Sequence, residues 1–295
     1  MKPKPSTEER IWAALAHLSA LLLGMGIVLP IVGWAEKRQK SKYASFQCLQ
    51  ALGYQSLGYT VWILATLVIL VIQSFTLLSQ MVAAAERNAD FDSLVAIGMG
   101  ANLLILGLIG VYAILPFVAA IACAFGKEFQ YPILGRRLAR YVEYEGEGLL
   151  HEEHQDRFVA AMGHFSVIIV LWGMLAPLTA WILQGKRSAW LKFQSVQTLA
   201  FQAGTILMYF VSAIIYMIGF VALIAATGLA GNPQVDPSAG MVSFVIFIAF
   251  SILAIFILMA IPLLHILGQW AGYRILKGDD YLYPILGKFI KARLK

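Results

Sequence analysis

Charged residues are scarce in this chain, and their scarcity excludes an ordinary soluble fold. Only 13% of the 295 residues are Asp, Glu, Lys or Arg, about half the share of a soluble domain. A helix needs about 20 apolar residues to cross the hydrocarbon core of a membrane. Six stretches without any charge are long enough for this: 11–35, 43–85, 93–126, 158–185, 193–235 and 237–273.

Cysteines and catalytic motifs are scarce as well. Cys48 and Cys123 lie in apolar stretches without metal-ligand spacing, which is typical of small packing residues. His151 and His154 are three residues apart rather than the four of a zinc peptidase, and they lie in a charged linker. No phosphate-binding loop, nucleotide-binding glycine pattern or Ser/His/Asp set is present. We therefore predict no enzymatic activity, no metal and no cofactor.

Backbone polar groups in lipid must be satisfied within their own segment, so the apolar stretches are expected to be helices. They contain no Asp, Glu, Lys or Arg, which argues against a proton- or ion-coupled transporter. The chain has no soluble basic domain that could bind nucleic acid. The predicted fold is an all-α, multi-pass helical membrane protein.

The chain contains an internal duplication. A shift of 147 residues, applied without a gap, aligns twelve identical residues, including polar types that apolar bias does not explain. They are Ala14, His17, Ser19, Gly26, Pro30, Trp34, Ser41, Phe46, Gln47, Gln50, Leu52 and Gln55 with their partners 147 positions later. Both copies end in Tyr-Pro-Ile-Leu-Gly, at 131–135 and 283–287. We predict membrane repeats at 8–141 and 155–295, joined by a charged linker at 142–154.

Basic residues mark the cytoplasmic ends of membrane helices. They cluster near the N-terminus, at 37–42, at 186–192 and at the end of each repeat, whereas the loop at 86–92 is acidic and that at 231–240 has only Asp236. This pattern predicts cytoplasmic N- and C-termini in a bacterial inner (plasma) membrane. It also predicts parallel copies related by a twofold axis along the membrane normal.

The first apolar segment of each repeat, 11–35 or 158–185, has basic residues at both ends. A re-entrant hairpin would keep both ends on one side, breaking near Gly24 to Gly26 or at Pro30, with Pro177 equivalent in the second copy. We favour this arrangement, with two long transmembrane helices following in each repeat. The alternative has single crossings, six in all, with inverted copies.

Polar residues recur inside the apolar stretches and are predicted to share one face in each repeat. They are His17, Ser19, Gln47, Gln50 and Gln55, and then His164, Ser166, Gln194, Gln197 and Gln202. Polar groups in a membrane face the bundle interior or a cavity. This face either forms hydrogen bonds between helices or lines a polar path. We favour the hydrogen-bonding role.

After each Tyr-Pro the chain is basic and amphipathic. Pro132 and Pro284 are predicted to end the crossing helices. The basic residues that follow are Arg136, Arg137 and Arg140, and Lys288, Lys291 and Arg293. We expect these segments to lie as helices on the anionic lipid of the cytoplasmic face, with apolar side chains such as Leu138 in the lipid.

Several motifs resemble those of a known family. They are Trp-Ala-Ala-Leu-Ala-His-Leu-Ser at 12–19, Pro30 with Trp34, Phe46-Gln47 with Gln50-Ala51-Leu52-Gly53-Tyr54-Gln55, and Tyr131-Pro132. They are similar to the bacterial membrane-domain family of unknown function related to the membrane subunit of the chloroplast inner-envelope import translocon. That family usually carries one such unit, whereas two fill this chain. The resemblance implies a helical membrane domain without assigned catalytic residues.

Two functions are consistent with these observations. The first is an accessory or scaffolding subunit that contacts lipid and other membrane-protein subunits. The second is a pore or protein-translocation component lined by the repeated polar face. The polar residues discriminate between them, because they line a hydrated cavity in the second case and pair in a dry core in the first.

Overall fold

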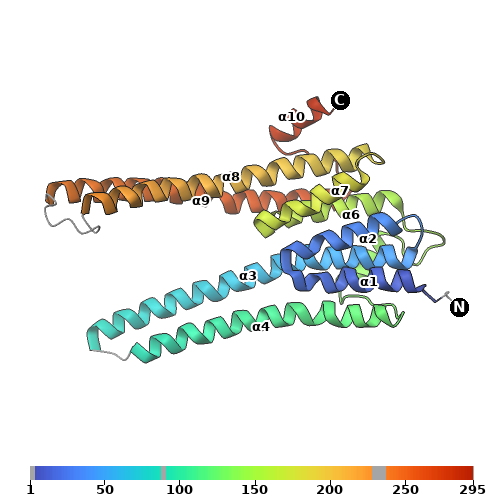
Figure 1. Cartoon of the computed structure of the whole chain (residues 1–295), viewed down its shortest axis with the longest axis horizontal. Coiled ribbons are helices and arrows are strands. Elements are labelled where there is room, and N and C mark those ends of the chain that lie inside the picture. The colour runs from blue at the N-terminus through green and yellow to red at the C-terminus, as the bar shows by residue number, and fades with distance from the viewer. Residues whose placement is uncertain (1–3, 88–90, 228–236, 295) are drawn as a thin grey trace.

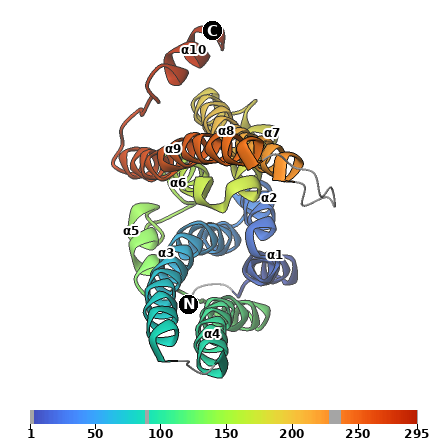
Figure 2. The same ribbon diagram turned by 90° about the vertical axis from the view of Figure 1, so that its left-hand side faces the viewer.

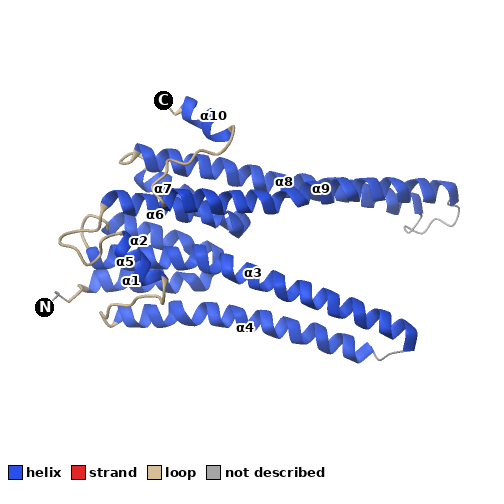
Figure 3. Cartoon of the chain, turned by 180° about the vertical axis from the view of Figure 1, so that it is seen from behind, coloured by secondary structure: helices blue, strands red, loops and turns tan. Residues whose placement is uncertain are grey.

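The structure, a computed structural model, describes residues 4–87, 91–227 and 237–294, and all secondary structure in these ranges is helical (Figure 3). The first unit comprises α1 (Thr7–Leu18), the 3-10 segment η1 (Ser19–Ile27), α2 (Val28–Lys37), α3 (Lys42–Arg87), α4 (Phe91–Ala124) and α5 (Leu134–Tyr141). The second comprises α6 (Glu152–Phe165), η2 (Ser166–Met174), α7 (Leu175–Gln184), α8 (Ala189–Thr227), α9 (Pro237–Leu276) and α10 (Leu286–Arg293). The loops predicted at 86–92 and 231–240 overlap residues outside these ranges.

The same order of elements occurs twice, and the two units are parallel. In each unit, two short helices joined by a 3-10 segment precede two long helices and a short final helix. The pairs α3/α4 and α8/α9 extend in the same direction from a common head, which contains the short helices (Figure 1). The parallel arrangement agrees with the charge pattern of the sequence.

The first apolar segment of the first unit folds back on itself as a hairpin. Glu8 near the start of α1 forms an ion pair with Lys37 at the end of α2. At the turn, a Cβ placed on Gly26 would lie only 1.9 Å from the carbonyl oxygen of Ser19. The chain reverses at Leu23, which has φ 52° and ψ −136°. Both ends of the segment therefore lie at the same end of the molecule, as the hairpin hypothesis predicts.

The second unit repeats this hairpin, with its reversal at Val170 (φ 49°), 147 positions after Leu23. Pro30 and Pro177 are not the helix breaks that the sequence suggested. Each is the third residue of its helix, α2 or α7. A proline is tolerated in the first turn because the amide hydrogen that it lacks would have no partner within the helix.

Glycines, rather than the predicted prolines, follow the ends of α4 and α9. Gly126 comes two residues after α4 with φ 71°, and Gly278 two residues after α9 with φ 96°. Such left-handed positions favour glycine because it has no Cβ. Pro132 and Pro284 lie further along, in the connections to α5 and α10. They shape these connections and do not end the long helices.

The long helices are longer than a bilayer requires. By length and apolar composition, six segments of the described chain could span a membrane, but two of them are the folded-back hairpins. The remaining four are α3, α4, α8 and α9. With 46 residues, α3 is about 69 Å long at 1.5 Å per residue, against a hydrocarbon core of about 30 Å. Its first part is buried in the head, and its later part exposes apolar side chains.

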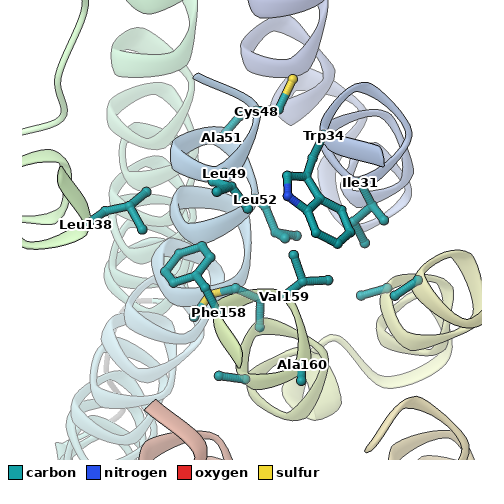
Figure 4. Close-up of a cluster of buried hydrophobic side chains, with 14 of the residues drawn as sticks. Ile31, Trp34, Cys48, Leu49, Ala51, Leu52, Leu138, Phe158, Val159 and Ala160 are labelled. Atoms are coloured by element: carbon teal, nitrogen blue, oxygen red, sulfur yellow. The ribbon is translucent and has the colours of Figure 1, made fainter. Parts of the chain in front are cut away.

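One apolar core joins the two units in the head. It contains Trp34 and Leu52 of the first unit together with Phe158 and Val159 of the second. Figure 4 shows these side chains converging between α2, α3 and α6. The units are therefore packed as one body at this end of the molecule.

The two units are not related by the twofold axis that the sequence predicted. Helix α3 packs against α6 and η2. A twofold axis would place α8 against α1 in the same way, but those helices share no comparable contact. In the view along the long helices, α1 and α8 lie apart, with α2 between them (Figure 2). The equivalent helices α2 and α7 contact each other, but otherwise each unit uses a different face, which makes the interface heterologous.

Candidate functional site: two buried polar clusters

The repeated polar residues of the first unit meet around His17 on α1. The Nε2 of His17 is 3.0 Å from Oε1 of Gln47 on α3, and its Nδ1 is 3.0 Å from the hydroxyl of Tyr131. Because an amide oxygen only accepts, Nε2 carries the proton and Nδ1 accepts from Tyr131. All three residues are buried, so the histidine uses both ring nitrogens inside the protein.

Gln47 and Gln50 fasten the connection after α4 to α3. Their amide groups donate to the carbonyl oxygen of Phe129 at 3.0 and 2.9 Å. The amide oxygen of Gln50 accepts from the backbone nitrogen of Tyr131 at 3.1 Å. Side chains thus satisfy backbone groups that no helix satisfies, as a buried connection requires.

Gln55 and Ser19 hold the turn of the hairpin. The amide group of Gln55 donates to Oγ of Ser19 at 3.0 Å and to the carbonyl oxygen of Ala16 at 3.2 Å. The hydroxyl of Ser19 donates to the same carbonyl at 2.8 Å. These bonds fix the end of α1 against α3, where the chain leaves regular helical geometry.

The second unit repeats the cluster. His164 contacts the Tyr283 hydroxyl at 2.8 Å and Gln194 Oε1 at 3.3 Å, Gln197 donates to the Tyr281 carbonyl at 2.9 Å, and Gln202 donates to Ser166 Oγ at 3.3 Å. Thr198, at the position of Ala51 in the first unit, adds a hydroxyl 3.0 Å from Nε2 of His164. Each cluster joins the equivalent parts of its unit. In the first unit these are α1, α3 and the connection after α4, and in the second α6, α8 and the connection after α9.

The ten predicted polar residues form one cluster in each unit. Each cluster is buried and is contained in its own unit. Sequence reasoning missed Tyr131 and Tyr283, whose hydroxyls complete the hydrogen bonding of the histidines. Two features of the sequence could have identified these tyrosines. A tyrosine precedes the proline in both copies, and a buried histidine needs a second hydrogen-bond partner.

The basic helices are only partly as predicted. Arg136, Arg137 and Arg140 are exposed on α5. Leu138, however, is buried in the core shared by the units and does not face lipid. The α5 helix is anchored on the protein because its apolar face packs against α3. On α10, Lys288, Lys291 and Arg293 are exposed, while Ile290 is buried.

An ion-pair cluster lies between the units. Arg38, only 3% exposed, contacts the carboxylate of Asp156 at 2.6 Å, and Arg187 lies 3.6 Å from the same carboxylate. The guanidinium of Arg38 also stacks over Trp34, 4.3 Å from the ring centroid. Burial lowers the pKa of Arg38, and the carboxylate opposes this effect. The repeat gave no hint of this cluster, because Gly185 holds the position of Arg38 in the second unit.

Fold and site together define an all-α, multi-pass integral membrane protein built from two tandem units with internally bonded polar clusters. The chain belongs to the magnetosome magnetite crystal formation protein family, whose model matches residues 8–138 and again 155–290. A bacterial membrane family and its duplication are thus confirmed, whereas the relation to the chloroplast import translocon stays a prediction. No curated protein and no solved structure matches the chain.

Proposed function

We propose that the chain is a non-enzymatic scaffold subunit of the membrane in which magnetite crystals form. The description of its family supports the setting. The observation that carries the scaffold role is the pairing of the buried polar residues. His17 and His164 each bond to a glutamine and a tyrosine of their own unit. Five surface grooves in the described part of the chain are lined by other residues.

The charged head of the molecule is proposed to lie at the cytoplasmic face of a bacterial inner membrane or a membrane derived from it. The first and last described residues and the basic segments after each hairpin lie at this end (Figure 1). Basic residues near membrane ends are retained in the cytoplasm. The exposed apolar turn of the hairpin, with Leu21 and Leu22, would then enter the inner leaflet.

The basic surface of α5 is proposed to bind anionic lipid headgroups. A groove of about 670 Å³ is lined by Arg136, Arg137 and Arg140 together with the exposed side chain of Ile133. Arginine matches phosphate oxygens with paired hydrogen bonds, and an apolar side chain beside it suits the acyl region. This contact would fix the head at the membrane surface.

Reconstitution into dye-loaded vesicles tests the scaffold role against the pore. We expect vesicles containing the full chain to retain a small anionic dye and a proton gradient as well as empty vesicles do. Leakage that disappears in a Gln50→Leu, Gln197→Leu variant would instead support a polar path. The family setting is tested by precipitating magnetite inside such vesicles, where the chain should change the distribution of crystal sizes. An unchanged distribution would count against a role in crystal formation.

A further inference from the structure

The contact between the two units leaves one copy of each contact face uncovered. The helices α2 and α7 contact each other, and beyond this the first unit presents α3 while the second presents α6 and η2. The equivalent faces are α8 in the second unit and α1 in the first. Because this larger part of the contact is heterologous, the α8 face and the α1 face are complementary, yet they do not contact each other within the described residues.

Burial of equivalent residues shows the unused face on α1. Phe158 and Met162 of α6 are 4% and 0% exposed at the contact. Their equivalents, Ile11 and Leu15, are 52% and 42% exposed. Leu18, equivalent to the buried Phe165, is exposed in the same way. The α1 face is thus an apolar surface of the kind that the second unit buries.

The unused face on the second unit comprises the end of α7 and the start of α8. Trp34 is fully buried at the contact and donates to Gln155 at 2.8 Å. Its equivalent, Trp181, is 39% exposed. The residue equivalent to Gln155 is Glu8, which pairs with Lys37 of its own unit and whose second carboxylate oxygen can accept from an indole. Leu52 is likewise buried, while its equivalent Leu199 is partly exposed.

We propose that a second copy of this chain docks head to tail, with its α1 face on the α7/α8 face of the first copy. The docked contact repeats the one between the two units of a single chain. Since units and copies are then joined in the same way, successive copies form a series in the membrane plane.

Side-chain sizes on the two open faces are complementary. At the internal contact, Gly53 faces Phe158, and a Cβ on the glycine would lie 2.8 Å from Cζ of the ring. The equivalents are Ala200 on α8 and Ile11 on α1. The methyl group gained by alanine is offset by the shorter isoleucine, so the same approach of the helices is preserved.

The two open faces also carry charges of opposite sign. Arg38 and Asp156 pair at the internal contact. On the open faces Glu9 holds the position of Asp156 and accepts from the backbone nitrogen of Ser6, whereas Gly185 holds the position of Arg38 and the exposed Lys186 follows it. Lipid could cover the apolar parts of both faces, but it offers no carboxylate to Lys186.

This inference rests on the proposed scaffold role, for which it names a partner, but its test is separate. The full chain is prepared with Ile11→Cys and with Ala200→Cys under different tags, and both are reconstituted together at a high lipid-to-protein ratio. A short bis-maleimide should link the two variants into mixed dimers. The yield should exceed that of a control pair by about tenfold, because docking raises the effective concentration of the thiols. The double variant should give a ladder of higher oligomers.

The control pair is Leu103→Cys with Leu263→Cys, two exposed positions on α4 and α9, 65% and 66% exposed, outside the proposed faces. Neither Ile11→Cys nor Ala200→Cys alone should form dimers, because a heterologous contact does not bring equivalent positions together. The proposal is overturned if the mixed pair links no better than the control pair, or if either single variant links to itself as strongly. Vesicles that retain dye but give no ladder would leave the scaffold role standing without self-docking.

Discussion

At the residue scale, the two buried histidines are structural groups whose partners are all supplied by the protein. Buried polar atoms are almost always hydrogen-bonded, and a membrane interior offers little water to replace a missing partner. The hydroxyl of Tyr131 is the donor that Nδ1 of His17 needs. Tyr283 serves His164 in the same way.

Replacing Tyr131 with Phe removes this donor and leaves a buried nitrogen without a partner. We expect the free energy of unfolding to fall by about 1–3 kcal/mol, the cost of an unsatisfied buried polar group. Tyr283→Phe should cost less, because the hydroxyl of Thr198 lies 3.2 Å from the same nitrogen of His164. Titration of SDS into detergent-solubilised protein, followed by circular dichroism, measures the change.

Tyr216→Phe is the matched control, because Tyr216 is 43% exposed on α8 and should tolerate the loss of its hydroxyl. Equal stability of Tyr131→Phe and Tyr216→Phe would show that the hydroxyl does not support His17.

The histidines, serines and glutamines of the clusters could be predicted because they recur in an apolar background. The role of Arg38 could not, since the second unit has glycine there. The backbone conformation of Ile133 could not be predicted either. It has φ 64° and ψ −64°, in a γ-turn that the backbone nitrogen of Leu134 closes on the carbonyl of Pro132 at 2.7 Å. β-branched residues rarely adopt positive φ, so its sequence favours no such turn.

At the element scale, the hairpins depend on close backbone approach at their turns. A Cβ on Gly26 would lie 1.9 Å from the carbonyl oxygen of Ser19, and one on Gly173 2.0 Å from that of Ser166. Sequence predicted the hairpin from the charges at both ends but could not choose between the glycines and Pro30. The reversal itself lies at Leu23, which carries no turn signal.

Gly26→Ala is therefore expected to destabilise the protein by about 1–3 kcal/mol, as overpacking a tight contact does. Gly173→Ala should have the same effect. Gly110→Ala provides the control, because nothing lies within 4 Å of a Cβ at that position in α4. Alanine favours a helix by about 1 kcal/mol over glycine. The SDS concentration at half-unfolding should therefore rise for Gly110→Ala and fall for Gly26→Ala. A rise in both would contradict the close approach.

Cysteine labelling measures the course of the hairpin across the membrane. Ser6→Cys and Lys40→Cys, before α1 and after α2, should react with a membrane-impermeant maleimide from the same side of sealed vesicles. Leu22→Cys, in the apolar turn, should react from neither side. Labelling of the first two positions from opposite sides would mean that the segment crosses the membrane.

At the scale of the whole molecule, the two units are held together by a shared apolar core and a buried ion pair. Arg38 and Asp156 face each other at 2.6 Å with little exposure. Burying two charges gains little over an apolar contact, but removing one partner leaves the other uncompensated. The pair therefore fixes how the units dock more than it adds to their total stability.

Arg38→Met tests this role. It leaves the carboxylate of Asp156 with Arg187 at 3.6 Å as the nearest cation, and the free energy of unfolding should fall by about 3–5 kcal/mol. Lys40→Met is the control, since Lys40 is exposed and pairs with Glu36 at the surface, where an ion pair contributes at most about 1 kcal/mol.

The double variant Arg38→Met, Asp156→Leu should recover most of this loss, because an apolar pair can replace a buried ion pair at little cost. The two substitutions would then be strongly non-additive, with a coupling energy obtained from the double-mutant cycle in SDS titrations. Additive losses would mean that Arg38 acts through its stacking on Trp34 and not through the carboxylate. Trp34 lies on α2 and Arg38 directly follows this helix, so that outcome would mean that aromatic packing, rather than charge, fixes how the units dock.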